Sequence, residues 1–136
     1  MSIRDNYLEI LKRKDAAAKR SGRNPKDVML MAVTKKHEPD ELKEAIDAGA
    51  TDFGENKVQE LLSKYDEVHP ERWHLIGHLQ TNKVRQIIDK VTMIHSVDSL
   101  KLAREINKRA AAADVVMDVL IEINLAEEES KTGISK

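Results

Sequence analysis

A pair of lysines that follows an apolar run is the first candidate for chemistry in this chain. Residues 28–33 are apolar, and Lys35 and Lys36 come after them with one threonine in between. If the run is a strand of a parallel sheet, its carboxyl end is where ligands bind. Side chains alternate along a strand, so Lys35 shares a face with Met31 and Val33, while Lys36 lies on the other face.

The surroundings of Lys35 decide what its amine can do. If its face lies inside a barrel, burial among apolar neighbours disfavours the charged ammonium and leaves an amine that attacks carbonyl carbons. Two surface lysines that open a loop account for the same residues and are, taken alone, the simpler interpretation. The residues themselves leave both interpretations open.

Two more candidates follow the next β-rich runs. Gly54 lets a ligand approach the backbone and Asn56 can donate or accept a hydrogen bond, although a glycine turn with a helix-capping Asn explains them equally well. His74 and His78 stand four residues apart, a spacing that suits a metal pair on a helix. The β-rich run around Trp73 puts His74 on a strand, and no His-Glu-x-x-His motif accompanies it, so we expect no metal site. His74 then either lines a ligand pocket or is satisfied within the core.

Alternating β-rich and helical segments must position these residues. Five candidate strands begin 19 to 23 residues apart, near Val28, Thr51, Trp73, Thr92 and Val115. That interval leaves room for one strand, one helix and two short loops, which is the repeating unit of a parallel sheet. The first strand is apolar on both faces, so we expect both faces to be covered. The last strand runs to Leu125 and carries Asp118 and Glu122 on one face, either as a polar layer inside a barrel or as solvated groups on an edge.

The segments around these strands have the period of helices that pack one apolar stripe on a sheet. Pro39 and Gly49 are expected to begin and end the helix after the first strand. Thr81 or Asn82 is expected to cap the helix after the third strand, and Asp98 the helix after the fourth. The stripes are Ile3, Tyr7, Ile10, Leu11 and Ala18; Leu42, Ala45 and Ile46; Val58, Leu61, Leu62 and Tyr65; Val84, Ile87 and Ile88; and Leu100, Ala103, Ile106 and Ala110.

Composition narrows the class of protein. The 136 residues suffice for one domain with its own core. Lysine and arginine total 23 against 24 acidic residues, and the net charge of −1 leaves no excess of positive charge for a nucleic acid. The absence of cysteine excludes disulfides, thiolate metal sites and a cysteine nucleophile. With no apolar run of about 20 residues and no signal-peptide pattern, we expect a soluble cytoplasmic protein that binds neither membrane nor nucleic acid.

Two architectures fit five βα units: an open doubly wound sheet and an incomplete (β/α)8 barrel. The open sheet is the direct interpretation of the length, because a complete barrel takes about 250 residues. No Gly-x-Gly-x-x-Gly or Walker sequence occurs in the chain. Its absence counts against a nucleotide-binding open sheet.

Five motifs at the ends of the expected strands occur in one order along the chain. They are Ala32-Val33-Thr34-Lys35, Asp52-Phe53-Gly54-Glu55-Asn56-Lys57-Val58-Gln59-Glu60, Trp73-His74-Leu75-Ile76-Gly77-His78-Leu79-Gln80-Thr81-Asn82-Lys83, His95-Ser96-Val97-Asp98-Ser99 and Glu129-Ser130-Lys131-x-Gly133. Together they resemble the pyridoxal phosphate homeostasis protein family over essentially the whole chain after its first helix. The resemblance implies a (β/α)8 TIM barrel related to the alanine racemase N-terminal domain, here as an N-terminal fragment of about five βα units in one domain, residues 1–136. It also implies that pyridoxal 5′-phosphate (PLP) is held as a Schiff base by Lys35, with Asn56 and His74 as pocket neighbours.

The same resemblance implies that the protein binds a cofactor and does not itself catalyse a reaction. Members of the family hold and deliver PLP and keep the free aldehyde low, without established catalysis. A PLP-dependent amino-acid racemase or decarboxylase is the alternative, although a second acid–base group and a substrate domain are not identifiable. A structural module that binds no cofactor is the third interpretation. The missing strands would leave sheet edges open, and those edges offer a route for chains to associate.

Overall fold

A parallel sheet of five strands organises the chain. The computed structural model describes residues 2–126 and 133–135. The strands lie in the order β1-β2-β3-β4-β5, and each pairs in parallel with the next. The elements are α1 (Ile3–Arg20), η1 (Pro25–Asp27), β1 (Met31–Val33), α2 (Pro39–Asp47), β2 (Asp52–Glu55), α3 (Val58–Tyr65), β3 (Arg72–Leu75), η2 (Thr81–Lys83), α4 (Val84–Ile87), β4 (Met93–Val97), α5 (Leu100–Ala113) and β5 (Asp118–Ile121).

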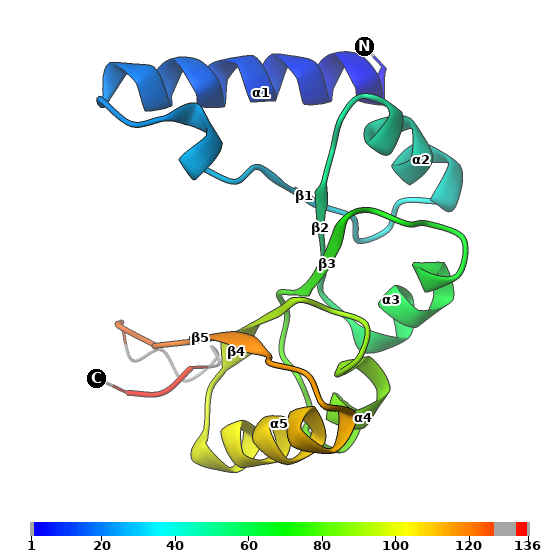
Figure 1. Cartoon of the computed structure of the whole chain (residues 1–136), viewed down its shortest axis with the longest axis vertical. Helices are drawn as coiled ribbons and strands as arrows, with labels where there is room; N and C mark the ends of the chain where they lie inside the picture. Colours follow the sequence, from blue (N-terminus) through cyan, green and yellow to red (C-terminus); the bar gives the residue numbers. More distant parts are fainter. Residues whose placement is uncertain (1, 127–132, 136) are drawn as a thin grey trace.

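The hydrophobic core lies between the sheet and helices α2 to α5, which run along one side of the strands (Figure 1). Because side chains alternate along a strand, every second residue of β2 and β3 points toward these helices, including Phe53 and Leu75. Apolar stripes of the helices cover them, as the period of the sequence predicts. The most deeply buried apolar residues are Phe53, Leu61, Val68, Leu75, Val84, Ile87, Ile94 and Leu102.

The opposite side of the sheet, which we call the open face, has no helix over it among the described residues (Figure 1). Met29 is 54% exposed and Val33 is 49% exposed. The expectation that both faces of the first strand are covered is therefore wrong. The five described strands curve only part of the way around, so apolar side chains on the inner side meet no opposing strand in the part of the chain that the structure describes.

Some of the expected residues begin or end the helices, whereas other helix caps differ from the expectation. Pro39 opens α2, and Gly49 follows its end with a φ of 111°, a conformation that glycine adopts at little cost. The cap of α5 is Ser99, whose hydroxyl accepts from the Leu102 N–H, and not Asp98. Leu100 of the expected α5 stripe is exposed.

The helix after the third strand is shorter than its apolar spacing indicates. A 3₁₀ turn occupies Thr81–Lys83, and the α-helix proper runs only from Val84 to Ile87. Thr81 and Asn82 therefore do not cap it, and Lys83 stands at the cap position without a side-chain hydrogen bond. Its apolar residues are nevertheless buried as predicted.

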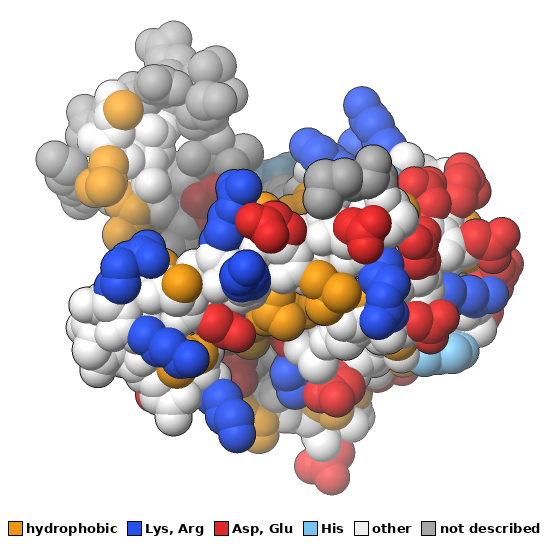
Figure 2. All heavy atoms as spheres, turned by 90° about the horizontal axis from the view of Figure 1, so that it is seen from above, with side chains coloured by type: hydrophobic (Ala, Val, Ile, Leu, Met, Phe, Trp, Pro, Cys, Tyr) orange, Lys and Arg blue, Asp and Glu red, His pale blue; other side chains and the backbone are white. Residues whose placement is uncertain are grey.

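Strands β1 and β5 are the outermost strands of the described sheet, and just past β5 Ile123 forms an isolated parallel bridge with Ile134. The expected last strand shortens to Asp118–Ile121, and all four of its residues are exposed. Asp118 is thus a solvated group on an edge strand and not part of a buried layer. On the face seen in Figure 2, acidic and basic side chains both occur, with hydrophobic side chains between them. Association of chains through the edges stays a prediction.

None of the described helices has the length and apolar character needed to cross a membrane.

Candidate functional site

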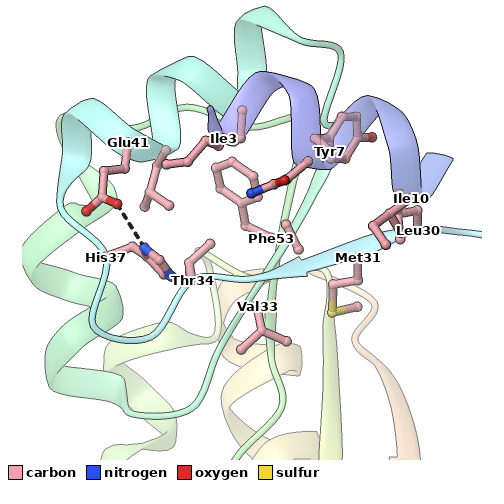
Figure 3. A pocket seen from close by; sticks show the side chains of 14 residues that line it. Ile3, Tyr7, Ile10, Leu30, Met31, Val33, Thr34, His37, Glu41 and Phe53 are labelled. Carbon is pink, nitrogen blue, oxygen red and sulfur yellow. Dashed lines mark hydrogen bonds and ion pairs between the residues drawn. The ribbon is translucent and has the colours of Figure 1, made fainter. Parts of the chain in front are cut away.

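The residues that the sequence marks as a site lie on or just beyond neighbouring strands: His74 is on β3, and Lys35 and Asn56 follow β1 and β2. Strand pairing aligns Val33, Gly54 and His74 at one level of the sheet. Lys35 and Asn56 lie two residues beyond Val33 and Gly54, just past the carboxyl ends of β1 and β2. Figure 3 shows that Val33 points to the opposite side of β1 from Thr34, as the alternation predicts.

Lys35 itself is exposed. It lies in the turn after β1, and its amine makes no hydrogen bond or ion pair with the described part of the chain. Burial among apolar neighbours, on which the sequence interpretation depended, is not met because nothing described covers the open face in front of it. An unpaired amine at the carboxyl end of a strand nevertheless remains free to meet a carbonyl compound.

Two side chains of α3 hold the turn that carries Lys35. Lys36 has a left-handed backbone with a φ of 64°, which is uncommon for a residue other than glycine. Its N–H donates to Glu60 Oε2 at 2.8 Å. On the other side of Lys35, the carbonyl oxygen of Thr34 accepts from Lys64 Nζ at 2.7 Å. The backbone on both sides of Lys35 is therefore anchored, while the amine stays free.

Lys64 is the centre of a buried ion network between α3 and β2. Its Nζ donates to Glu55 Oε2 at 3.0 Å and to Glu60 Oε2 at 2.9 Å, and Thr34 Oγ1 donates to Glu55 Oε2 at 2.7 Å. Burial raises the pKa of Glu55, and the hydrogen bond from Lys64 lowers the pKa of Glu60 to about 2. Burial alone would lower the pKa of Lys64, but its hydrogen bonds to Glu60 and Glu55 raise it, so the ammonium stays charged at neutral pH.

His74 lies on the open face of β3 and is 2% exposed. Its Nε2 is 2.7 Å from Asp52 Oδ2, and its Nδ1 is 3.0 Å from Nε2 of His95. Asp52 also accepts two hydrogen bonds from the Arg72 guanidinium, both at 2.8 Å, and one from the Thr51 hydroxyl. Burial alone would raise the pKa of Asp52, but the hydrogen bonds from Arg72, Thr51 and His74 together hold it well below its usual range.

The carboxylate of Asp52 should make stability depend on acid. Because the pKa of Asp52 is depressed in the folded chain, its contribution is present above the unfolded value of about 3.9 and is lost as the pH falls toward the folded value. At pH 7 we expect Asp52→Asn to cost about 1–2 kcal/mol, since the amide keeps part of the hydrogen bonding. Urea unfolding of both proteins at pH 7 and pH 3 should show this difference shrinking at the lower pH. A difference that grows at pH 3 would contradict the ionised assignment.

Only part of this hydrogen-bonded group of Asp52, Arg72, His74 and His95 could be identified from the sequence. His74 is buried and hydrogen-bonded on both ring nitrogens, as expected for a histidine satisfied within the core, whereas a place in a ligand pocket stays a prediction. Asp52, Arg72 and His95 were missed as partners. Counting by two along the strands would have placed Asp52 on the face of Gly54, but their contacts depend on the strand register, which only the structure shows.

Asn56 is partly buried, and its backbone is in close contact with Gly77 at the end of β3. A Cβ on Gly77 would clash with the carbonyl oxygen of Asn56 and lie 2.9 Å from its Cα. Neither Asn56 nor a residue next to it caps a helix with its side chain, because Lys57 is the cap residue of α3. The close approach at Gly77 therefore sets where the Asn56 backbone lies.

The second histidine of the pair does not join the first. His78 Nδ1 is 3.3 Å from Asp98 Oδ2, whereas His74 bonds to Asp52 and His95. Within residues 2–126 and 133–135, no three His, Cys, Asp or Glu side chains are placed to hold a metal ion. The motif from Glu129 to Gly133 lies largely outside the described residues.

An apolar cavity of about 280 Å³ lies beside β1, under α1 and α2 (Figure 3). Ile3 and Tyr7 of α1 and Phe53 of β2 line it, and its polar groups include the pair of His37 Nδ1 and Glu41 Oε2, 3.1 Å apart. Lys35 does not line this cavity. The cavity is also not lined by Asp52, Arg72, His74 or His95, so it is separate from their hydrogen-bonded group.

The chain is similar in sequence and in structure to several known proteins. A "Pyridoxal phosphate homeostasis protein" of Aquifex aeolicus is 40% identical over 136 residues, covering 98% of this chain and 60% of the relative. The structure of PipY from Synechococcus elongatus, solved with PLP bound, matches with a TM-score of 0.74 and 33% identity, over 89% of this chain and 57% of PipY. A histidine racemase from Leuconostoc mesenteroides matches with a TM-score of 0.66 at 14% identity, over 98% of this chain and 33% of the racemase, and shows a shared fold.

This chain spans about 60% of the length of the Aquifex relative and 57% of PipY. The sequence profile of the family described as "Alanine racemase, N-terminal domain" matches residues 9–135, nearly the whole chain. That match, together with the five-stranded parallel sheet, confirms the expected fold class. The chain belongs to the alanine racemase N-terminal domain family.

Proposed function

We propose that this chain binds PLP as a Schiff base through Lys35 and serves intracellular PLP homeostasis in the cytoplasm, without catalysing a reaction. The observation that carries the proposal is the free amine of Lys35 at the carboxyl end of β1, on a turn anchored from both sides. The naming of the Aquifex relative and the PLP bound to PipY support it. The ligand is a small molecule, and a net charge of −1 favours neither nucleic acid nor an anionic membrane as a partner.

The residues on the open face fit the chemistry of this cofactor. When bound, PLP supplies an aldehyde that condenses with a primary amine, and a ring that needs hydrogen-bonding neighbours. Lys35 would provide the amine, and the side chain of Asn56, just past the end of β2, would donate or accept a hydrogen bond. His74, on β3 and held by Asp52, would be a polar neighbour of the ring.

A PLP-dependent amino-acid racemase or decarboxylase is the second candidate, and the alanine racemase family match is the observation that favours it. Such an enzyme needs acid–base groups on the substrate in addition to the cofactor lysine. A holding protein needs only the lysine and its neighbours. Measuring D/L conversion and CO₂ release from amino acids with added PLP separates the two, and we expect neither product.

Reduction with borohydride in the presence of PLP tests the site directly. We expect the reduced pyridoxyl group on Lys35 alone when the modified peptides are mapped, because the neighbouring lysines are not placed beside Asn56 on the open face. Lys35→Ala should abolish both the label and the absorbance band of the imine. Lys36→Ala is the matched control and should keep both. Label scattered over many lysines, in the parent chain as in Lys35→Ala, would overturn the proposal.

A further inference from the structure

The turn that carries Lys35 is closed by a hydrogen bond of its own backbone. The N–H of His37 donates to the carbonyl oxygen of Thr34 at 3.2 Å, so Lys35 and Lys36 are the two central residues of a four-residue turn. Lys36 is the third residue of this turn, and its φ of 64° is one that glycine or asparagine usually supplies there. A lysine does not favour this conformation by itself, so other contacts must hold the backbone in place.

A single carboxylate oxygen of α3 holds the left-handed residue. Oε2 of Glu60 accepts from the Lys36 N–H at 2.8 Å and from Lys64 Nζ at 2.9 Å. Lys64 Nζ also donates to the Thr34 carbonyl oxygen at 2.7 Å. The two side chains thus reach the turn from the same helix, one on each side of Lys35. Helix α3 therefore fixes the backbone from which the Lys35 side chain extends.

The two carboxylates that bond to Lys64 have different surroundings. The side chain of Glu55 is fully buried, whereas that of Glu60 is 29% exposed. Of the two, only Glu60 accepts from a backbone N–H of the turn in the described part of the chain. The hydrogen bonds from Lys64 and from the Lys36 N–H lower the pKa of Glu60 to about 2, so its acceptor is a carboxylate at neutral pH. Glu55 therefore belongs to the buried core of the network, and Glu60 to the turn.

The energy of this contact is comparable to the cost of the turn. A left-handed backbone at a residue other than glycine has a cost that corresponds to about a tenfold change in an equilibrium constant. A hydrogen bond from an N–H to a charged acceptor contributes a similar or larger amount. The bond from Lys36 to Glu60 therefore offsets the cost, and without it we expect the backbone to relax toward negative φ.

We infer that Glu60 is a positioning residue for Lys35: by holding the Lys36 N–H, it keeps the Lys35 amine in the place from which it reacts with an aldehyde. The inference rests on the proposed function, because imine formation at Lys35 is the event that Glu60 would affect. In that reaction the nitrogen of the neutral amine bonds to the aldehyde carbon, and its two hydrogens leave with the carbonyl oxygen as water. Glu60 takes no part in these transfers and acts only through the backbone. Since the N–H of Lys36 is the group involved, Lys36→Ala leaves the contact intact.

Hydrogen exchange of the Lys36 amide tests the contact before any cofactor is added. We expect this amide to exchange about tenfold faster in Glu60→Ala than in the parent chain, because it loses its acceptor. Glu60→Gln should stay close to the parent, since its side-chain amide still offers an oxygen. A Lys36 amide that is already unprotected in the parent would overturn the inference.

Titration with PLP, followed by borohydride reduction and peptide mapping, measures the effect on Lys35. We expect Glu60→Ala to raise the PLP concentration for half-maximal labelling of Lys35 by about tenfold. Glu60→Gln should raise it clearly less. Glu67→Ala is the matched control, because Glu67 is exposed and lines the same polar pocket as Glu60, yet its carboxylate makes no hydrogen bond or ion pair with a described residue. It should label as the parent does.

The double variant Glu60→Ala with Lys36→Gly separates positioning from a general loss of structure. Glycine adopts a φ near 64° at little cost, so the double variant should recover a large part of the lost labelling at Lys35. If Glu60 served only as the ion-pair partner of Lys64, a change at Lys36 would recover nothing. Labelling as weak in the double variant as in Glu60→Ala would therefore overturn the positioning role.

The outcomes distinguish this inference from the function on which it rests. Equal labelling of Lys35 in the parent and in Glu60→Ala would overturn the inference and leave the cofactor site standing. Absence of Lys35 labelling in the parent would overturn the proposed function, and exchange of the Lys36 amide would still report whether Glu60 holds the turn. Circular dichroism melting curves show that each variant is folded. If Glu60→Ala is not, Glu60→Asp takes its place with the same expected loss, because it keeps the negative charge near Lys64 on a side chain one carbon shorter.

Discussion

Replacing Lys64 with methionine is expected to lower the free energy of unfolding by about 3–5 kcal/mol, the usual cost of removing one partner of a buried ion pair. The side chain of Lys64 is 6% exposed, and that of Glu55 is fully buried. Methionine fills the space but cannot donate to Glu55, Glu60 or the Thr34 carbonyl. The fully buried carboxyl group of Glu55 would then remain without its cation, whereas Glu60 is still reached by water. Urea unfolding followed by circular dichroism at pH 7 measures the loss.

Two further variants show that the effect belongs to the network. Lys43→Met replaces an exposed lysine on α2 and should change the free energy by no more than about 0.5 kcal/mol. The double variant Lys64→Met with Glu55→Met removes the buried carboxylate as well as its cation, so it should recover part of the loss. If Lys64→Met unfolds as easily as Lys43→Met, the network contributes nothing measurable.

Gly77→Ala is expected to cost about 3 kcal/mol, at the upper end of the range for overpacked sites. The added methyl group would collide with the carbonyl group of Asn56, which is backbone and cannot rotate away. The end of β3 or the segment after β2 must therefore move. Thermal unfolding measures the loss of stability. Borohydride labelling with PLP shows whether the reaction of Lys35 is disturbed as well.

Gly54→Ala is the control for this variant because the same methyl group meets a flexible neighbour. Its Cβ would lie 2.6 Å from Met31 Sδ, at the far end of a side chain that can adopt other rotamers, and 3.1 Å from Ile76 Cδ1. We expect it to destabilise the chain clearly less than Gly77→Ala. Equal losses would mean that the backbone contact at Asn56 is not the cause.

The alternation of strands and helices could be predicted because it depends on residues that are close together in the sequence. Apolar residues three and four apart mark α2, α3 and α5, and β-rich runs between them mark the strands. Boundaries were less reliable where two residues compete for one role. Asp98 and Ser99 can both cap a helix, and Ser99 does so while Asp98 lies beside His78.

The polar networks could not be predicted, since each joins residues that are distant in the chain. On sequence alone, Lys64 is one more charge on the solvated face of a helix, yet it is buried against Thr34, 30 residues away. The contact between His74 and Asp52, 22 residues apart, requires the register of β2 against β3. The exposure of Lys35 could not be foreseen either, because it depends on how far the sheet curves.

The two acidic residues of β2 have a consequence for how the strand finds its alignment. Asp52 and Glu55 are three residues apart and so point to opposite faces, where Arg72 and Lys64 neutralise them separately. A slip of one residue would turn each carboxylate toward the wrong side, away from its own cation and into an apolar or empty environment. A misaligned strand would thus carry two unneutralised charges at once, so the two ion pairs favour the native register of β2.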